Sequence, residues 1–217
     1  MRLFLDSSDT HQWSDAARAN LLYGVTTNPL IFKREGLQYS IQNITRLIDT
    51  ARDLDLRELQ IQVTEVSDPD AAIRAFMPLY ERWPQGVVAK VPFCPTTAMV
   101  LEKLPLEVPV TMTTGYAATQ AILATQRGAR YIAPYYGRLQ EAGEDADQIV
   151  DDMLAICTGT QTRVLVASLR NNEQLISLCR RGHDTFTISP SLMHSMLTNR
   201  LSEQATVAFE DALQNNR

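Results

Sequence analysis

A lysine carried by an apolar strand is the residue best placed in this sequence to do chemistry. Residues 86–92 read Gly-Val-Val-Ala-Lys-Val-Pro, a run typical of a strand that is buried on both faces and ended by a proline. Burial of Lys90 would disfavour the charged ammonium form, and a neutral amine can attack a ketone to form a Schiff base. The competing interpretation is structural: a lysine that reaches water or pairs with a carboxylate.

Further polar side chains recur where similar apolar runs end. They comprise a carboxylate, a phenol, several hydroxyls and amides, and two arginines: Asp6, Thr26, Asn28, Gln62, Thr113, Tyr135, Arg138, Ser168 and Arg170. The carboxylate and the phenol could transfer protons, the amides and hydroxyls could bind sugar hydroxyls, and the arginines could bind a terminal phosphate. Together with Lys90, this set suits carbonyl chemistry on a phosphorylated sugar.

Eight short apolar segments carry these residues, and each is predicted to be a strand: residues 3–6, 23–29, 59–64, 86–92, 108–114, 130–135, 163–168 and 185–189. Helical stretches alternate with them, and no Gly/Ser/Pro-rich linker divides the chain. We therefore predict an α/β fold, a single (β/α)8 TIM barrel over residues 1–217, whose polar strand ends meet in one pocket. An open doubly wound sheet is the alternative, although a GxGxxG motif after the first strand is absent.

Three local expectations accompany the barrel. The polar stretch 137–147 is expected to be a loop before a helix at 149–157, and His183 is expected to be a surface residue in the turn before the eighth strand. A C-terminal helix is expected at residues 202–213. Its apolar residues, among them Ala205, Ala208 and Phe209, keep an amphipathic spacing, so the helix could pack on its own barrel or on a neighbouring copy.

Composition excludes several classes of function. The net charge is −5, with 20 Lys and Arg against 25 Asp and Glu, and no basic block marks a nucleic-acid or membrane surface. Three cysteines without CxxC spacing indicate reduced thiols in a cytoplasm, and no apolar run approaches 18 residues. We expect a soluble, cytoplasmic protein. The three histidines are scattered without ligand spacing, so no metal site is expected.

Several motifs resemble the transaldolase family. They are Leu-Asp at 5–6, Gly-Val-Thr-Thr-Asn-Pro at 24–29, Val-Ala-Lys-Val-Pro at 88–92, Ala-Pro-Tyr at 133–135 with Arg138, and Ala-Ser-Leu-Arg at 167–170. The resemblance runs through the whole chain, whose length is similar to that of the small subfamily that includes fructose-6-phosphate aldolase. It implies a class I, Schiff-base aldol mechanism without metal or organic cofactor. It also implies a ring-forming homo-oligomer, commonly a decamer.

The resemblance also implies catalytic roles, carried over position by position. Lys90 would form the iminium with C2 of a ketose, which is the electron sink for breaking the C3–C4 bond. Asp6 would transfer a proton at the C4 hydroxyl, and Tyr135 would supply an acid. Gln62 and Thr113 would position the water used in proton transfer and iminium hydrolysis.

Binding roles follow in the same way. Thr26 would lie beside the catalytic water, and Asn28 would hold hydroxyls of the three-carbon fragment. Arg138, Ser168 and Arg170 would bind the distal phosphate, because a dianion favours bidentate guanidinium contact.

Two activities remain open within the family. Transaldolases usually carry Glu, Ser and Phe where this chain has Gln62, Ala133 and Tyr135, and at these positions the chain resembles the fructose-6-phosphate aldolases. Residues 137–138 and 167–171 look more like the transaldolases. We favour an aldolase that cleaves or forms the C3–C4 bond of fructose 6-phosphate, with transfer of a dihydroxyacetone unit between sugar phosphates as the alternative. A barrel that binds a sugar phosphate without turnover is a third hypothesis, from a different class.

Overall fold

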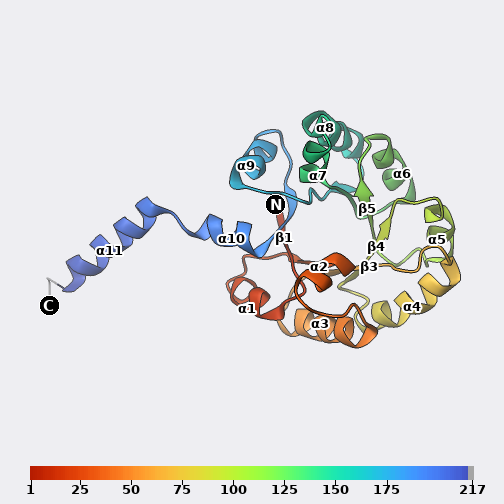
Figure 1. Ribbon diagram of the computed structural model, residues 1–217, viewed down its shortest axis with the longest axis horizontal. Coiled ribbons are helices and arrows are strands. Elements are labelled where there is room, and N and C mark those ends of the chain that lie inside the picture. Colours follow the sequence, from red (N-terminus) through yellow and green to blue (C-terminus); the bar gives the residue numbers. More distant parts are fainter. Residues whose placement is uncertain (215–217) are drawn as a thin grey trace.

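Eight parallel strands form a ring in this computed structural model, which describes residues 1–214 (Figure 1). They are β1 (Arg2–Asp6), β2 (Gly24–Thr26), β3 (Glu58–Gln62), β4 (Val87–Pro92), β5 (Val110–Gly115), β6 (Tyr131–Pro134), β7 (Arg163–Val164) and β8 (Thr185–Ile188). Strands β1 to β7 pair in chain order, and β8 pairs with β1. The amide of Val166 donates to the carbonyl of Thr185 over 3.0 Å, and the amide of Thr187 donates to that of Val166 over 3.0 Å. These bonds close the ring beyond β7, so the predicted TIM barrel is confirmed.

Helices occupy the connections and surround the ring. The described ones are α1 (Thr10–Arg18), α2 (Pro29–Arg34), α3 (Ile41–Asp53), α4 (Pro69–Arg82), α5 (Thr97–Lys103), α6 (Thr119–Arg127), α7 (Tyr136–Glu141), α8 (Ala146–Cys157), α9 (Asn172–Arg180), α10 (Pro190–Leu197) and α11 (Arg200–Gln214). Local chemistry fixes several starts: the side chains of Asp9, Ser40 and Asp68 accept main-chain amides as N-caps, and Pro69 begins α4. Among residues 1–214, no helix combines the length and apolarity needed to cross a membrane.

Successive residues of each strand face two different cores in turn. Val87, Ala89 and Val91 of β4 are fully buried in the large core that also contains the helices' apolar side chains. A second, smaller cluster, which contains Phe4 and Tyr131, comes from alternate strand positions and fills the interior of the ring. Lys90 falls on that inward set, which is how the strand carries an amino group into the barrel.

Two local expectations are wrong. Part of the predicted loop at 137–147 is the helix α7, because Tyr136 and Leu139 lie one turn apart and both are buried against the barrel. His183 is also not a surface residue: it is 2% exposed, and its Nε2 lies 3.0 Å from Oδ1 of Asp151. Burial lowers the pKa of His183, and the bond to Asp151 opposes that shift. This histidine ties the start of β8 to α8.

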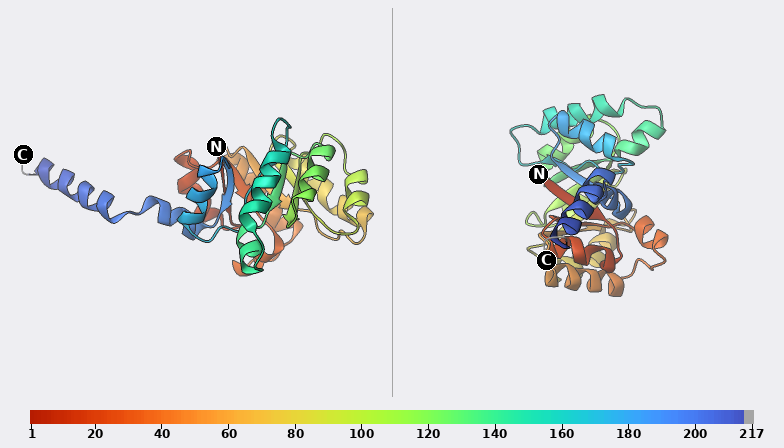
Figure 2. Two further views of the ribbon diagram at one scale, coloured as in Figure 1. Left: turned by 90° about the horizontal axis from the view of Figure 1, so that it is seen from above. Right: turned by 90° about the vertical axis from the view of Figure 1, so that its left-hand side faces the viewer.

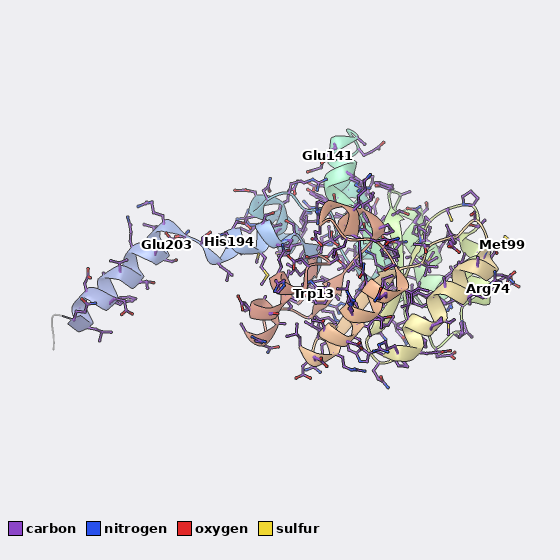
Figure 3. The ribbon with its side chains drawn as sticks, turned by 60° about the horizontal axis from the view of Figure 1, so that its bottom comes forward. Trp13, Arg74, Met99, Glu141, His194 and Glu203 are labelled. Carbon is purple, nitrogen blue, oxygen red and sulfur yellow. The ribbon has the colours of Figure 1, made fainter. Side chains whose placement is uncertain are left out.

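Helix α11 stands away from the barrel (Figure 2). All of its described side chains are exposed, including Leu201 at 64% and Phe209 at 67%. Figure 3 shows Glu203 on α11 well clear of the ring, with His194 on α10 at the connection. The C-terminal helix is therefore present as predicted. It does not pack on its own barrel, which was one of the two expected partners.

Candidate active site

One cavity opens at the carboxyl ends of the strands. Its volume is about 230 Å³. The predicted site residues among its lining come from β1, β2, β4, β5 and the segments after β2, β6 and β7: Asp6, Thr26, Asn28, Lys90, Thr113, Tyr135, Arg138, Ser168 and Arg170. Because all eight strands are parallel, their carboxyl ends share one mouth of the barrel. Nine of the ten predicted site residues meet there, and Gln62 is the exception.

Lys90 lies at the inner end of the cavity. It is 4% exposed, and its Nζ donates a 3.0 Å hydrogen bond to the main-chain carbonyl of Thr27. None of the ion pairs within residues 1–214 involves Lys90. The structural interpretation, in which Lys90 pairs with a carboxylate or reaches water, therefore does not fit the structure. An amine at this position can reach a ligand through the cavity.

Asp6 shares the cavity with Lys90. Its Oδ1 accepts a 2.6 Å hydrogen bond from Oγ1 of Thr26, whose hydroxyl also lies 2.6 Å from that of Thr187. Desolvation raises the pKa of Asp6, although the ammonium of Lys90 and the bond from Thr26 act in the opposite direction. A carboxyl group with a raised pKa is suited to both accepting and donating a proton near neutral pH.

A phenol faces the cavity from the other side of the mouth. Oγ1 of Thr113 donates to the hydroxyl of Tyr135 over 3.2 Å. The guanidinium carbon of Arg138 lies 4.9 Å from the centre of the Tyr135 ring, and the ring of Tyr116 packs against it edge to face at 5.8 Å. These contacts fix the ring and leave its hydroxyl directed at the same space that Lys90 reaches.

The wall beside Tyr135 is suited to an anion. Ser168 has a left-handed backbone (φ +66°), and its buried Oγ has no hydrogen-bond partner among the described residues. The amide of Gly137 donates to the carbonyl of Ser168 over 3.1 Å, and a Cβ at position 137 would lie 2.1 Å from that oxygen. Only glycine allows this approach, which brings Arg138 beside Ser168. Arg170 is held differently, by a 2.9 Å ion pair with Glu141.

Asn28 and Gln62 are engaged elsewhere. The Oδ1 of Asn28 caps α2 by accepting the amides of Leu30 and Ile31 at 2.9 and 3.1 Å, so its NH₂ group remains for a ligand. The Nε2 of Gln62 donates to the main-chain carbonyl of Lys90 over 3.1 Å. Gln62 lines a separate cavity of about 270 Å³ beside α3 and α4, so the structure does not bring it into the site.

Two polar lining residues escaped the sequence analysis. Thr187 of β8 lies in the cavity wall and contacts Thr26. It could have been found from the sequence, because alternate residues of the last strand face the interior of the barrel. Arg34 lines the cavity from the end of α2, where it pairs loosely with Glu35 at 3.6 Å. No local pattern marks Arg34, because six residues along an α-helix turn through about 600°, which leaves Asn28 and Arg34 on different faces.

Comparisons with known proteins agree with this geometry. The sequence profile described as Transaldolase/Fructose-6-phosphate aldolase matches residues 3–216. A probable transaldolase of Caulobacter vibrioides is 30% identical over 212 residues, covering 96% of this chain and 94% of the relative. A probable transaldolase of Nitrosopumilus maritimus is 28% identical over 209 residues, covering 94% and 90%.

Solved structures show the fold alone. The tryptophan synthase A-subunit of Pyrococcus furiosus is similar with a TM-score of 0.63 at 14% identity, covering 88% of this chain and 87% of that one. The citrate synthase SbnG gives a TM-score of 0.58 at 12% identity, covering 99% and 93%.

The fold and the site thus define a (β/α)8 barrel whose carboxyl-terminal mouth holds a buried lysine and a wall with two arginines. The chain belongs to the transaldolase/fructose-6-phosphate aldolase family.

The raised pKa of Asp6 makes a prediction about stability. A carboxyl group whose pKa is raised by folding stabilises the protein fully below its unfolded pKa, about 3.9, and this contribution is lost as pH rises through the folded value. Asp6→Asn removes the ionisation. We expect the variant to gain stability relative to the wild type as pH rises, by on the order of 1 kcal/mol at pH 8, measured by urea unfolding between pH 4 and 8.

Asp49 offers a control of opposite sign. Hydrogen bonds from Arg82 hold the pKa of Asp49 below its ordinary value, so when the series is extended to pH 2, Asp49→Asn should lose stability relative to the wild type as pH rises from about 2 to 5 and change little above that. A loss of stability in Asp6→Asn that grows with pH would show that Asp6 is stabilised as a carboxylate, against this account.

Proposed function

We propose that this protein is a class I aldolase that cleaves and forms the C3–C4 bond of fructose 6-phosphate through a Schiff base on Lys90. The observation that carries the proposal is a buried lysine, outside the ion pairs of residues 1–214, in one cavity with Asp6 and Tyr135. Family membership supports the same chemistry. The proposed reaction uses side chains of this chain and neither a metal ion nor an organic cofactor.

Cleavage begins with attack of the Lys90 amine on C2 of the open-chain ketose. Loss of water gives the iminium, which accepts the electron pair of the C3–C4 bond as that bond breaks. Asp6 takes the proton of the C4 hydroxyl, so glyceraldehyde 3-phosphate leaves as an aldehyde and an enamine remains on Lys90. The phosphate would lie against Arg138, Ser168 and, after Arg170 turns from Glu141, a second guanidinium.

Release requires a proton at C3 of the enamine. Tyr135 is the acid we assign to this step, with Thr113 orienting its hydroxyl. Hydrolysis of the resulting iminium then frees dihydroxyacetone and restores the amine. Thr26 would hold Asp6, and the NH₂ group of Asn28 would bind a hydroxyl of the three-carbon fragment. Gln62 was expected to hold a water, but it does not line this cavity. We assign Gln62 instead to positioning the strand that carries Lys90.

Transaldolase activity is the second candidate. The relatives described above are named probable transaldolases. In that reaction the same enamine attacks an acceptor aldose, so fructose 6-phosphate and erythrose 4-phosphate would give sedoheptulose 7-phosphate. The two activities share every step up to the enamine. They differ in whether an acid reaches C3 before an acceptor does.

Product analysis separates the two activities. With fructose 6-phosphate alone, we expect stoichiometric glyceraldehyde 3-phosphate and free dihydroxyacetone. Tyr135→Phe removes the acid and should lower dihydroxyacetone release about a hundredfold, while transfer to erythrose 4-phosphate falls much less. Tyr116→Phe removes a hydroxyl from the neighbouring ring and should leave both rates near those of the wild type.

Efficient synthesis of sedoheptulose 7-phosphate by the wild type, with almost no dihydroxyacetone released, would replace the aldolase assignment with the transaldolase one. Absence of both products would leave a binding protein.

The anion wall makes a second kinetic prediction. Arg138→Ala removes a charge-assisted contact to phosphate, so the KM for fructose 6-phosphate should rise about tenfold or more, while turnover of unphosphorylated fructose stays nearly constant. Arg74→Ala, on the outer surface of α4 (Figure 3), is the control and should change neither value. Equal losses on both substrates would show that Arg138 supports the fold of α7.

The third part of the proposal is a homo-oligomer built with α11. Leu201, Ala205 and Phe209 lie along one face of the helix, and the barrel of the same chain does not cover them. A second copy of this chain is the partner we propose, which agrees with the family resemblance. A ring needs head-to-tail contacts, so α11 of one copy would pack on the barrel of the next.

Light scattering tests the contact. The wild type should have the mass of several chains, and Phe209→Asp should shift it toward one chain because a charge enters the apolar face. Thr206→Asp adds the same charge away from that face and should keep the wild-type mass. A wild type that has the mass of one chain contradicts the proposal.

A further inference from the structure

The amino-terminal mouth of the barrel holds a second charged cavity, which the proposed reaction does not use. Its volume is about 620 Å³, and it is bordered by the starts of β1 and β3 and by the loops that enter β5, β6 and β7. Parallel strands place this mouth at the opposite end of the barrel from Lys90. We call it the basal cavity.

Arginine dominates the lining of the basal cavity. Four guanidinium groups, from Arg2, Arg127, Arg130 and Arg163, line it together with the two carboxylates of Glu58 and Glu107. This local excess of positive charge contrasts with the net charge of −5 for the whole chain.

Two of the arginines are paired with carboxylates. Arg130 lies 3.0 Å from Glu58, which is 2% exposed, and Arg163 lies 2.5 Å from Asp184 at the rim. The other two have no carboxylate within 4 Å in the part of the chain that the structure describes. Arg2 and Arg127 are therefore the two arginines of this lining that lie outside the ion pairs of residues 1–214.

The contacts of Arg2 are with neutral groups. Its Nη1 donates to the hydroxyl of Tyr131 over 2.5 Å, and its guanidinium carbon lies 4.6 Å from the centre of the Tyr23 ring. Desolvation, reinforced by the carboxylate of Glu58, raises the pKa of Tyr131, so the phenol stays protonated and cannot neutralise Arg2. It donates instead to Oε1 of Glu58 over 3.0 Å.

Arg127 supplies the second observation. Its Nη2 is buried, and no hydrogen-bond acceptor for it lies among residues 1–214. A buried donor left unbonded lowers stability, and a charged one lowers it more. Arg2 and Arg127 both line the basal cavity, so an oxyanion bound there would lie against two guanidinium groups.

We propose that the basal cavity is an anion site for a phosphate group of a small metabolite, bound by Arg2 and Arg127 and bordered by Arg130 and Arg163. Guanidinium groups bind phosphate in a bidentate geometry, which suits a wall of several arginines. Arg2 and Arg127 supply two guanidinium groups outside the ion pairs of residues 1–214, while Glu58 and Glu107 disfavour a longer polyanion such as a nucleic acid. The volume exceeds that of phosphate and leaves room for an organic body beside Tyr23.

Equilibrium dialysis of the full-length protein against radiolabelled inorganic phosphate at constant ionic strength tests this site. We expect two phosphates per wild-type chain, one at each mouth of the barrel. Arg127→Gln and Arg2→Gln should each weaken one class of site at least tenfold, and Arg127→Lys, which keeps the charge without the planar fork, should weaken it less. Arg138→Ala should weaken only the other class.

The outcomes separate this site from the proposed function. Phosphate that is lost in Arg138→Ala but retained in the Arg2 and Arg127 variants would overturn the basal site and leave the aldolase proposal intact. Binding that is equal in all variants would overturn it too, showing that these arginines only close the barrel.

Thermal unfolding with and without phosphate is the second readout: the phosphate-dependent rise in Tm should be smaller in Arg127→Gln than in the wild type, whatever that variant does to the Tm in chloride.

Discussion

The rest of the site depends on one constraint, an amine held inside the barrel and outside the ion pairs of residues 1–214. The Nζ of Lys90 is bonded to a main-chain carbonyl, that of Thr27, and the residues on either side of the lysine, Ala89 and Val91, are fully buried. A cation in such a place is costly, and pairing it with an acid would have been the stabilising arrangement. The fold instead pairs β4 with β3 and β5 in a register that sets Lys90 beside Gln62 and Thr111, so the strand cannot turn the amine outward.

Polar groups near Lys90 also have few partners among the described residues. Among residues 1–214, Asp6 has no ion pair within 4 Å, and desolvation raises the pKa of its carboxyl group although Thr26 donates a hydrogen bond to it. Ser168 has a strained backbone and a hydroxyl without a hydrogen-bond partner in the same residues, and Gly137 allows α7 to approach it. These features lower the free energy of unfolding, and each leaves a polar group available to a ligand.

Much of this arrangement could be predicted from the sequence. Apolar runs ended by polar residues located the strands, and parallel strands in a barrel bring those residues together whatever their separation in the chain, which is why Asp6 and Arg170 meet. Side-chain direction was harder to predict. Gln62 occupies an expected strand end, yet its amide bonds the main chain of Lys90, because the last residue of a strand is free to leave the alternation. Arg34 and the pairing of His183 with Asp151 depend on tertiary contacts that have no local pattern.

The central claim, that Lys90 is the residue that bonds to the substrate, can be measured directly. The chain has three lysines, Lys33, Lys90 and Lys103, which peptide mapping can separate. Incubation with dihydroxyacetone followed by borohydride reduction should attach one reduced three-carbon unit to the peptide that contains Lys90, and Lys90→Arg should abolish the adduct while keeping the fold. An adduct on the peptide of Lys33 or Lys103, or no adduct on an enzyme that still turns over fructose 6-phosphate, would contradict the account.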